Sequence, residues 1–218
     1  ETENTNKTKH RQDLLERIVS ESNFNEAKKR VKSNKGAGGI DDMSVKELTA
    51  YMIDHQDELK QKILDGKYRP KAVRKVEIPK DNGKTRQLGI PTVVDRVVQQ
   101  AISQVLSPMY EEVFSENSYG FRPNRSAHMA LEKSLEYIGE GYRWVVDMDL
   151  EKFFDTVNQS KLIQVLSNQI KDGRVISLIH KFMRAGIMDD GMFKESQKGV
   201  PQGGPLSPLL GNIMLNES

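Results

Sequence analysis

Apolar residues recur along this chain at two spacings, and the spacing separates predicted helices from predicted strands. A recurrence every three or four residues places apolar side chains on one face of a helix. The clearest such stripe consists of Val94, Val97, Val98, Ala101, Ile102 and Val105. The segments predicted to be helical are one from Gln12, 45–65, one opened by Pro91 and Thr92, one ending near 138, 158–171 and 175–184. A capping-box pattern, Ser44 with Glu47, starts the second of these helices.

Alternating apolar and polar residues predict strands, most clearly on either side of the turn sequence at 81–83. The runs 73–80 and 84–90 flank this turn and together predict an antiparallel hairpin. A short strand pair is predicted around 189–192, and residues 144–146 open another strand. Because strands and helices are interspersed and one pair is antiparallel, the predicted fold class is α+β.

Glycine and proline mark three loops, at 33–44, 118–127 and 200–208. The last loop reads VPQGGPLSP, with prolines and glycines on both sides of Gln202, so its backbone has a fixed shape and can be approached closely. Pro205 fits the first turn of a following helix. An irregular start of a helix is the alternative explanation, but such a density of special backbone residues usually marks a site.

The composition bears on where the protein is located, and it shows that partners cannot be inferred from the overall charge. Lys and Arg number 33 against 31 Asp and Glu, so only local patches bear on partners. The main basic stretch is 60–86, where ten Lys or Arg face three acidic residues. Cysteine is absent, which fits a reducing compartment. With no secretory signal and no apolar run of membrane-spanning length, we expect a soluble, cytoplasmic protein with no membrane partner.

The segment 145–157, VVDMDLEKFFDTV, places several carboxylates at the end of the predicted strand. Asp147, Asp149 and Glu151 would share one strand face, with Asp155 just beyond. Carboxylates at a strand end are natural ligands of Mg²⁺, and two such ions about 4 Å apart can support phosphoryl transfer. A solvated strand end is the alternative. Spacing alone does not select one carboxylate.

Lys80 and Arg86 flank the turn of the basic hairpin, where a point charge and a bidentate donor suit a triphosphate. A solvated hairpin face is the alternative. A simple two-residue turn would pair Lys80 with Thr85 and direct Arg86 to the opposite face. We therefore predict an odd number of loop residues or a bulge. The glycine cluster at 36–41 is compatible either with phosphate contact or with flexible linkage.

The loop YGFRPNRSA combines Tyr119 and Phe121 with Arg122 and Arg125. Aromatic and arginine side chains together suit stacking on bases and gripping a nucleic-acid backbone. An ordinary turn with Phe121 in the core is the alternative.

Taken together and in order, five stretches resemble the reverse transcriptases of the maturase type that bacterial group II introns encode. They span roughly 35–215 and read KGAGGID, IPKDNGKTRQLGIPTVVDRVVQQAI, YGFRPNRSAHMAL, DMDLEKFFDTV and GVPQGGPLSPLL. The resemblance implies a right-hand polymerase fold, fingers plus partial palm, with an antiparallel sheet and packed helices. Residues 1–90 would form an N-terminal extension and fingers, and 91–218 a partial palm, within which 158–198 could return to the fingers.

The resemblance also implies roles for single residues. Asp149 looks like the first metal-binding aspartate for Mg²⁺, with the Leu150 carbonyl as a second ligand. Phe154 is similar to the aromatic gate that excludes a ribose 2′-OH, and Phe153 would lie beside it against the incoming deoxynucleotide. The remaining implied contacts are Lys80 and Arg86 to the triphosphate, Gln202 to the nucleotide, Arg122 and Arg125 to the template, and Arg69, Lys71 and Arg74 to RNA. Asp147 and Glu151 are not ligands in this pattern, and Asp155 is expected to be structural.

One part of the family pattern is missing, a Tyr-x-Asp-Asp hairpin downstream of PQGG. Asp189 and Asp190 precede PQGG without a leading tyrosine, so we reject them as a substitute. We therefore expect a fragment that binds RNA but does not extend primers, with self-association possible through exposed palm surface.

For the full-length protein the resemblance implies an RNA-directed DNA polymerase that uses dNTPs and an RNA template with a DNA primer. It also implies a maturase that binds its group II intron RNA to assist splicing and mobility. The alternatives are a non-catalytic RNA-binding module of the same fold, or the reverse transcriptase of a retron or diversity-generating element.

Overall fold

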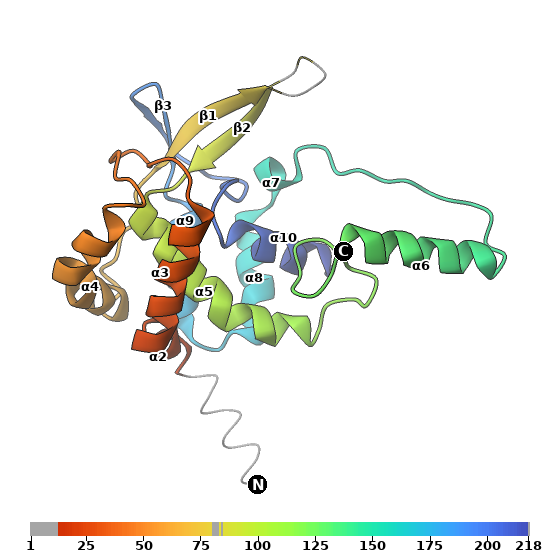
Figure 1. The fold of residues 1–218 in the computed structure, drawn as a ribbon, viewed down its shortest axis with the longest axis horizontal. Helices are drawn as coiled ribbons and strands as arrows, with labels where there is room; N and C mark the ends of the chain where they lie inside the picture. The colour runs from red at the N-terminus through yellow and green to blue at the C-terminus, as the bar shows by residue number, and fades with distance from the viewer. Residues whose placement is uncertain (1–12, 80–82, 84, 218) are drawn as a thin grey trace, which may run out of the picture.

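The computed structural model describes residues 13–79, 83 and 85–217. Helices pack beneath one side of a small sheet, and one further helix, α6, stands apart at the end of two long connections (Figure 1). The expected frayed tail at 1–10 lies outside the described residues. No helix in the described part of the chain is long and apolar enough to cross a membrane.

The sheet has four strands in the order β2-β1-β3-β4. The basic hairpin is confirmed, since β1 (Val73–Pro79) pairs antiparallel with β2 (Thr85–Ile90). The second predicted pair is also confirmed, as β3 (Ile187–Asp189) and β4 (Met192–Lys194). However, β1 pairs with β3 in parallel, so the sheet is mixed and the expectation of an antiparallel sheet was wrong. The reason is the long connection between β2 and β3, which returns the chain to the end of the sheet where β2 finished, so that β3 runs in the same direction as β1.

Helix α5 (Val93–Glu111) is the centre of the core, as its apolar stripe predicts. The Thr92 hydroxyl accepts a hydrogen bond from the Asp95 N–H and caps the helix, while most of the stripe is fully buried. Helices α2 (Leu14–Ile18), α3 (Glu21–Asn34) and α4 (Leu48–Leu64) contribute further side chains to the same core.

Two helix boundaries differ from the predictions because local hydrogen bonds stop the helix. The predicted first helix is divided at Ser20, whose hydroxyl caps α3 by accepting from the Asn23 N–H. Helix α4 begins at Leu48 rather than at Val45. The Glu47 carboxylate does accept from both the N–H and the hydroxyl of Ser44, so part of the capping box forms, but around a turn.

The segment 145–150 contains no strand, which corrects the prediction made from its apolar start. Residues 143–150 run extended and exposed after α6 (Ala127–Gly139), and the side chain of Trp144 is 96% exposed. An extended segment becomes a strand only when a neighbour satisfies its N–H and C=O groups. The described residues offer this segment no partner, whereas α6 satisfies its own backbone and forms as predicted.

Three C-terminal helices appear where helices were predicted: α8 (Gln159–Gln169), α9 (Gly173–Met183) and α10 (Ser207–Leu215). The single turn α7 (Phe153–Thr156) was not predicted, because the segment before residue 158 was interpreted as a strand and its continuation. The expectation that Pro205 occupies the first helical turn was wrong, because α10 begins at Ser207 and Pro208 takes that place. One continuous core includes residues from both predicted halves, 1–90 and 91–218, so that division stays a prediction. Self-association also stays a prediction.

Candidate nucleotide and nucleic-acid site

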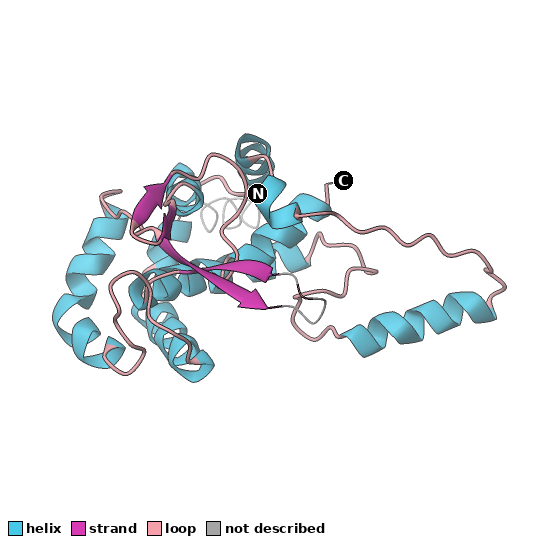
Figure 2. Cartoon of the chain, turned by 90° about the horizontal axis from the view of Figure 1, so that it is seen from above, coloured by secondary structure: helices cyan, strands magenta, loops and turns pink. Residues whose placement is uncertain are grey.

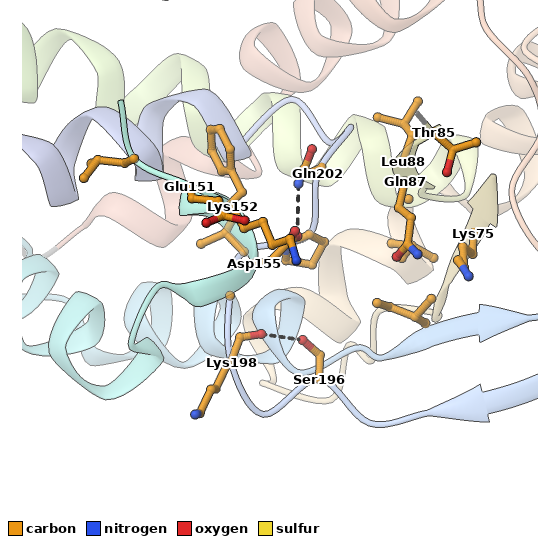
Figure 3. Close-up of a pocket in the computed structure, with 18 of the residues that line it drawn as sticks. Lys75, Thr85, Gln87, Leu88, Glu151, Lys152, Asp155, Ser196, Lys198 and Gln202 are labelled. Carbon is orange, nitrogen blue, oxygen red and sulfur yellow. Dashed lines mark hydrogen bonds between the residues drawn. The ribbon is translucent and has the colours of Figure 1, made fainter. Parts of the chain in front are cut away.

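A cavity of about 1010 Å³ lies where the sheet meets α7 and the PQGG loop (Figure 3). Its walls come from three parts of the chain that are distant in sequence: the β1–β2 hairpin, residues 149–155, and the segment from β3 to the PQGG loop. The lining residues discussed below are Lys75, Asp149, Leu150, Phe154, Asp155 and Gln202. The cavity therefore brings together residues that the sequence alone could only treat as separate motifs.

Asp149 and Leu150 are in this wall, just before α7, as a metal site would require. Glu151 and Asp155 line the same cavity. Even so, no group of three or more His, Cys, Asp or Glu in the described residues is arranged to hold a metal ion. A carboxylate and a backbone carbonyl are the hard oxygen donors that Mg²⁺ accepts, and Mg²⁺ commonly keeps water and phosphate in its other positions. Asp149 and the Leu150 carbonyl would supply part of the coordination shell of one Mg²⁺ ion. A site for two ions needs further carboxylates.

The two phenylalanines of α7 take different positions. Their rings meet edge to face with centroids 5.4 Å apart. Phe154 forms part of the cavity wall, while Phe153 is half-buried behind it. Gly211 of α10 allows this packing, because a Cβ there would lie 3.0 Å from the Phe154 ring. The gate position predicted for Phe154 is compatible with this placement, and its role stays a prediction.

The PQGG loop is bonded to α7 along its backbone. The Val200 N–H donates to the Phe154 carbonyl at 2.7 Å, and the Gly199 N–H donates to the Val157 carbonyl at 2.8 Å. Gly199 has φ +80°, and a Cβ at this position would lie 2.6 Å from the Phe154 carbonyl oxygen. Only glycine combines this backbone conformation with this approach.

Gln202 is held from two sides. Its carbonyl accepts from the Gly89 N–H of β2 at 2.9 Å, and its side-chain Nε2 donates to Asp155 Oδ1 at 3.0 Å (Figure 3). The next residue, Gly203, has φ +105° and packs on the Gly89 carbonyl, where a Cβ would lie at 2.4 Å. Gln202 thus connects the sheet to α7 across the cavity.

The glycine loop at 36–39 is a packed element rather than a flexible link. Arg96 of α5 donates to the carbonyls of Lys35 (3.2 Å) and Ala37 (2.6 Å) from beneath. Burial lowers the pKa of the Arg96 guanidinium. Gly39 lies on the backbone of Thr92, where a Cβ would be 2.6 Å away. These contacts explain the glycines by close packing, and phosphate contact stays a prediction.

Asp95, the neighbour of Arg96, organises the basic stretch. Its buried carboxylate accepts from the Tyr68 hydroxyl (2.6 Å), the Thr92 hydroxyl (2.7 Å) and the Lys71 N–H (3.1 Å). Burial raises the pKa of this carboxyl, although the three hydrogen bonds act in the opposite direction. The carboxylate thus holds the backbone at Lys71 and the buried ring of Tyr68, while the Lys71 side chain is exposed.

The three cations predicted to grip RNA lie on this stretch with partial exposure. Arg69 donates to the carbonyls of Gly66 and Tyr68. Lys71 pairs with Asp41 at 3.1 Å, and Arg74 contacts both Asp42 and the Gly39 carbonyl. Lys71 and Arg74 therefore contact the glycine loop and the residues just after it, whereas the hydrogen bonds of Arg69 stay within its own turn.

The two arginines predicted to contact the template differ in exposure. Arg122 is 9% exposed and is bonded to the Glu111 carboxylate and to the carbonyls of Ser115 and Ser118. Arg125 is on the surface, donates to the Glu116 carbonyl and lies over the Tyr119 ring. Phe121, placed in the core as one alternative, is instead exposed. Arg122 is thus placed to shape the loop from inside, and Arg125 to contact a partner.

The hairpin turn can be followed only in part. Lys80 and the side chain of Arg86 lie outside the described residues. The register places Ile78 opposite Arg86 and Pro79 opposite Thr85, so residues 80–84, an odd number, form the connection. This confirms the odd loop that a shared face requires, while the triphosphate role stays a prediction.

Asp189, rejected as a metal ligand, has cationic partners. Its carboxylate accepts from Lys194 at 2.6 Å and from Lys75 at 3.2 Å. The Lys194 hydrogen bond, and then that of Lys75, lower the pKa of this carboxyl. The residue joins β4 to β1 by charge, which is a structural role.

Comparison with known proteins decides the family. A family profile described as "Reverse transcriptase (RNA-dependent DNA polymerase)" matches residues 78–218, well over half of the chain. The chain belongs to the reverse transcriptase family. The fold of this family member is similar to that of the "Partial Cas6-RT-Cas1--Cas2 complex", with TM-score 0.64 at 24% identity over 94% of this chain and 34% of the other.

Two curated relatives are similar to most of this chain, and one of them is encoded by a group II intron. Protein YkfC of Escherichia coli is 42% identical over 212 residues, which are 94% of this chain and 56% of YkfC. The group II intron-encoded protein LtrA of Lactococcus lactis is 40% identical over 189 residues, 85% of this chain and 31% of LtrA. The chain therefore spans about half the length of one relative and a third of the other.

Sequence reasoning missed three features of the structure: the roles of the buried residues Asp95 and Arg96, and the hydrogen bond between Asp155 and Gln202. The first two carried a usable signal, since a charged pair interrupts the apolar run VVDRVV of α5. Charges buried within such a run need specific partners. Asp155 carried no comparable signal, because its partner Gln202 is known only from the fold.

Proposed function

We propose that this chain forms the fingers and part of the palm of an RNA-directed DNA polymerase of the group II intron type. One observation carries the proposal: Asp149, Leu150, Phe154 and Gln202, which come from two distant motifs, line a single cavity at the edge of the basic hairpin. The family and the similarity to LtrA support the same chemistry.

In this proposal the full-length protein extends a DNA 3′ end on an RNA template. Asp149 and the Leu150 carbonyl would hold Mg²⁺, which supplies charge neutralisation at the phosphates when bound. Lys80 and Arg86 would hold the triphosphate of the incoming dNTP. Phe154, in the cavity wall, would exclude a 2′-OH by its bulk, with Phe153 supporting it from behind.

The described residues alone supply one carboxylate and one carbonyl in the metal-binding positions, without a cluster of three acidic or histidine ligands. We therefore propose that the 218-residue chain binds nucleic acid without extending primers. The full-length protein would also act as a maturase, because binding folded RNA needs only a basic, shape-reading surface. Arg69, Lys71, Arg74 and Arg125 provide the accessible cations for it.

Primer extension tests the polymerase. The full-length protein should extend a DNA primer on an RNA template with Mg²⁺, and Phe154→Ala should raise ribonucleotide incorporation at least about 10-fold, as expected when a bulky side chain is a steric gate. Phe193→Ala is the matched control, because Phe193 lies on β4 outside the cavity wall. Unchanged sugar selectivity in Phe154→Ala would reject the gate, and no extension by the wild type would reject the polymerase.

Salt-dependent binding tests the RNA surface. The 218-residue chain should bind structured RNA with an affinity that falls steeply as salt rises. Replacing Arg69 and Lys71 with Gln should reduce the log–log salt slope by about 0.7–0.9 for each lost phosphate contact, the range between single strands and a duplex. The double variant Lys133→Gln, Arg143→Gln, on α6 and in the exposed connection after it, is the control that removes the same two positive charges. Equal slopes for the variant of Arg69 and Lys71 and for this control would contradict a role for the basic stretch.

A further inference from the structure

In the hydrogen bond between Asp155 and Gln202, the amide is the donor and the carboxylate is the acceptor. A side-chain amide has a donor end and an acceptor end of nearly the same shape, so it can occupy its site in two orientations. An ionised carboxylate only accepts hydrogen bonds. Because Asp155 Oδ1 lies 3.0 Å from Gln202 Nε2, the donor end of the amide is directed toward α7. The choice of aspartate at 155 thus decides which end of the amide the rest of the cavity meets.

Asp155 is itself held in place by its backbone surroundings. Helix α7 is a single turn that starts from Lys152 in the left-handed conformation, with φ 52°. That conformation is costly for a residue with a side chain and persists where the surroundings enforce it. Here the Asp155 N–H donates to the Lys152 carbonyl at 2.9 Å, and the carbonyl before it, that of Phe154, accepts from Val200. The carboxylate therefore projects from a defined turn.

Gln202 is fixed at its backbone by a different set of bonds. Its carbonyl is bonded to β2 through Gly89, and the loop before it is bonded to α7 through Gly199 and Val200. The Gln159 amide supports the loop from the buried side, donating to the Gly199 carbonyl at 2.9 Å. Because the backbone is held on both sides of Gln202, the torsions that can still change are those of its side chain. The hydrogen bond to Asp155 restricts these torsions.

We propose that Asp155 is a positioning residue that fixes the orientation of the Gln202 amide toward the incoming deoxynucleotide. The proposal rests on the function proposed above, in which Gln202 lines the nucleotide pocket. Asp155 differs in role from its neighbours, because Phe154 meets the nucleotide directly and Asp149 meets the metal. Asp155 also lines the cavity, and the contact through which it would act on the nucleotide is its hydrogen bond from Gln202.

The first test measures the amide itself in the 218-residue chain. In ¹⁵N-labelled protein the Gln202 side-chain NH₂ resonances are assigned by their loss in Gln202→Ala. Asp155→Asn should shift them and speed their exchange with water about 5-fold or more, because one charge-assisted hydrogen bond is lost. Asp147→Asn is the matched control, an exposed carboxylate eight positions earlier whose removal should leave the resonances in place. Unmoved Gln202 resonances in Asp155→Asn overturn the proposal.

The second test measures the nucleotide. In dTTP titrations of the same chain, Asp155→Asn should weaken binding about 5- to 10-fold, because its amide is neutral and can present a donor to Gln202 as well as an acceptor. Asp155→Glu, which keeps a charged group that only accepts, should recover part of the loss. In primer extension by the full-length protein, KM for dTTP should rise by the same factor with kcat within about 2-fold, which a general structural defect would not produce. Asp147→Asn should match the wild type in both assays.

The outcomes separate this proposal from the proposed function. Equal dTTP affinity of the wild-type and Asp155→Asn chains, including no measurable affinity in either, overturns the positioning role. A loss confined to kcat, or thermal destabilisation in Asp155→Asn that accounts for the KM change, does the same. Full-length protein that extends no primer counts against the polymerase, whereas the amide resonances and the titration still decide the role of Asp155.

Discussion

Helices α5 and α6 are both amphipathic, but α5 is packed inside the core and α6 is exposed to solvent. Nearly all of one side of α5 is buried, including the charged residues Asp95 and Arg96. No residue of α6 is buried, and both views show it set apart from the rest of the chain (Figures 1 and 2). The contrast teaches that a helix can form from local signals alone, while its place in the molecule comes from partners. Four experiments can break or sharpen this contrast.

Removing equal side chains from the two helices should give the largest difference. Leu106 of α5 is 0% exposed and Leu135 of α6 is 67% exposed. Leu106→Ala should cost about 2–5 kcal/mol of unfolding free energy, because a cavity is left in the core. Leu135→Ala should change it by less than about 0.5 kcal/mol. Urea unfolding of both variants measures this, and equal losses would mean that α6 is packed in solution.

Arg96 tests whether α5 also fixes the glycine loop. Arg96→Met should cost about 1–3 kcal/mol, because the carbonyls of Lys35 and Ala37 lose a charged donor. Amide exchange in the loop 36–42 should speed up in the same variant. The control is Arg143→Met, an exposed arginine in the connection after α6. Unchanged exchange in the loop would show that Arg96 does not hold it.

Acid should lower the free energy of unfolding of the core through Asp172, a buried carboxyl at the start of α9, which does not belong to α6. Burial alone would raise the pKa of Asp172, but hydrogen bonds from Arg174 and the Leu15 N–H outweigh it, so the pKa is lowered. A carboxyl with a lowered folded pKa contributes stability that is present above its unfolded value, near 3.9, and is lost as pH falls through the folded value.

Unfolding free energy should therefore decline below about pH 4. Asp172→Asn should flatten this decline by removing the titrating group, and should lower the plateau near neutral pH. A decline that keeps its slope in Asp172→Asn would assign the acid sensitivity to another group.

The smallest effect is expected at the cap of α6. The Ser126 hydroxyl accepts from the Met129 N–H, and Ser126→Ala should cost about 1 kcal/mol of local helix stability. Amide exchange within α6 should rise about 5-fold, with no change in the global urea midpoint. Because α6 has no buried residues, its helix depends on this local bond far more than α5 depends on Thr92. A shifted global midpoint would show that α6 is coupled to the core.

The same distinction explains what the sequence could predict. Hairpin β1–β2, α5, α8 and α9 depend on turns, caps and apolar periodicity, all of which are local, and they appear within a few residues of their predicted bounds. The strand from 145 failed because a strand needs a partner, and periodicity does not report one. The parallel pairing of β1 with β3 was missed for the same reason.

The site shows a similar limit. Motif reading placed Asp149, Leu150, Phe154 and Gln202 in one pocket, and the cavity contains all four. It treated Arg122 as a surface contact, although its guanidinium is enclosed by Glu111 and two carbonyls. A residue type indicates which groups it can bind, but burial decides whether those groups belong to the protein or to a ligand.

The bond from the Gly89 N–H to the Gln202 carbonyl has a consequence for synthesis on the ribosome. Helices α2 to α5 and the β1–β2 hairpin make most of their contacts among residues that emerge early, so they can pack as the chain is made. The cavity cannot exist until residue 202 has emerged, because its last wall closes a long stretch of chain. A nascent chain therefore presents the cations of 69–74 well before it has a place for a nucleotide.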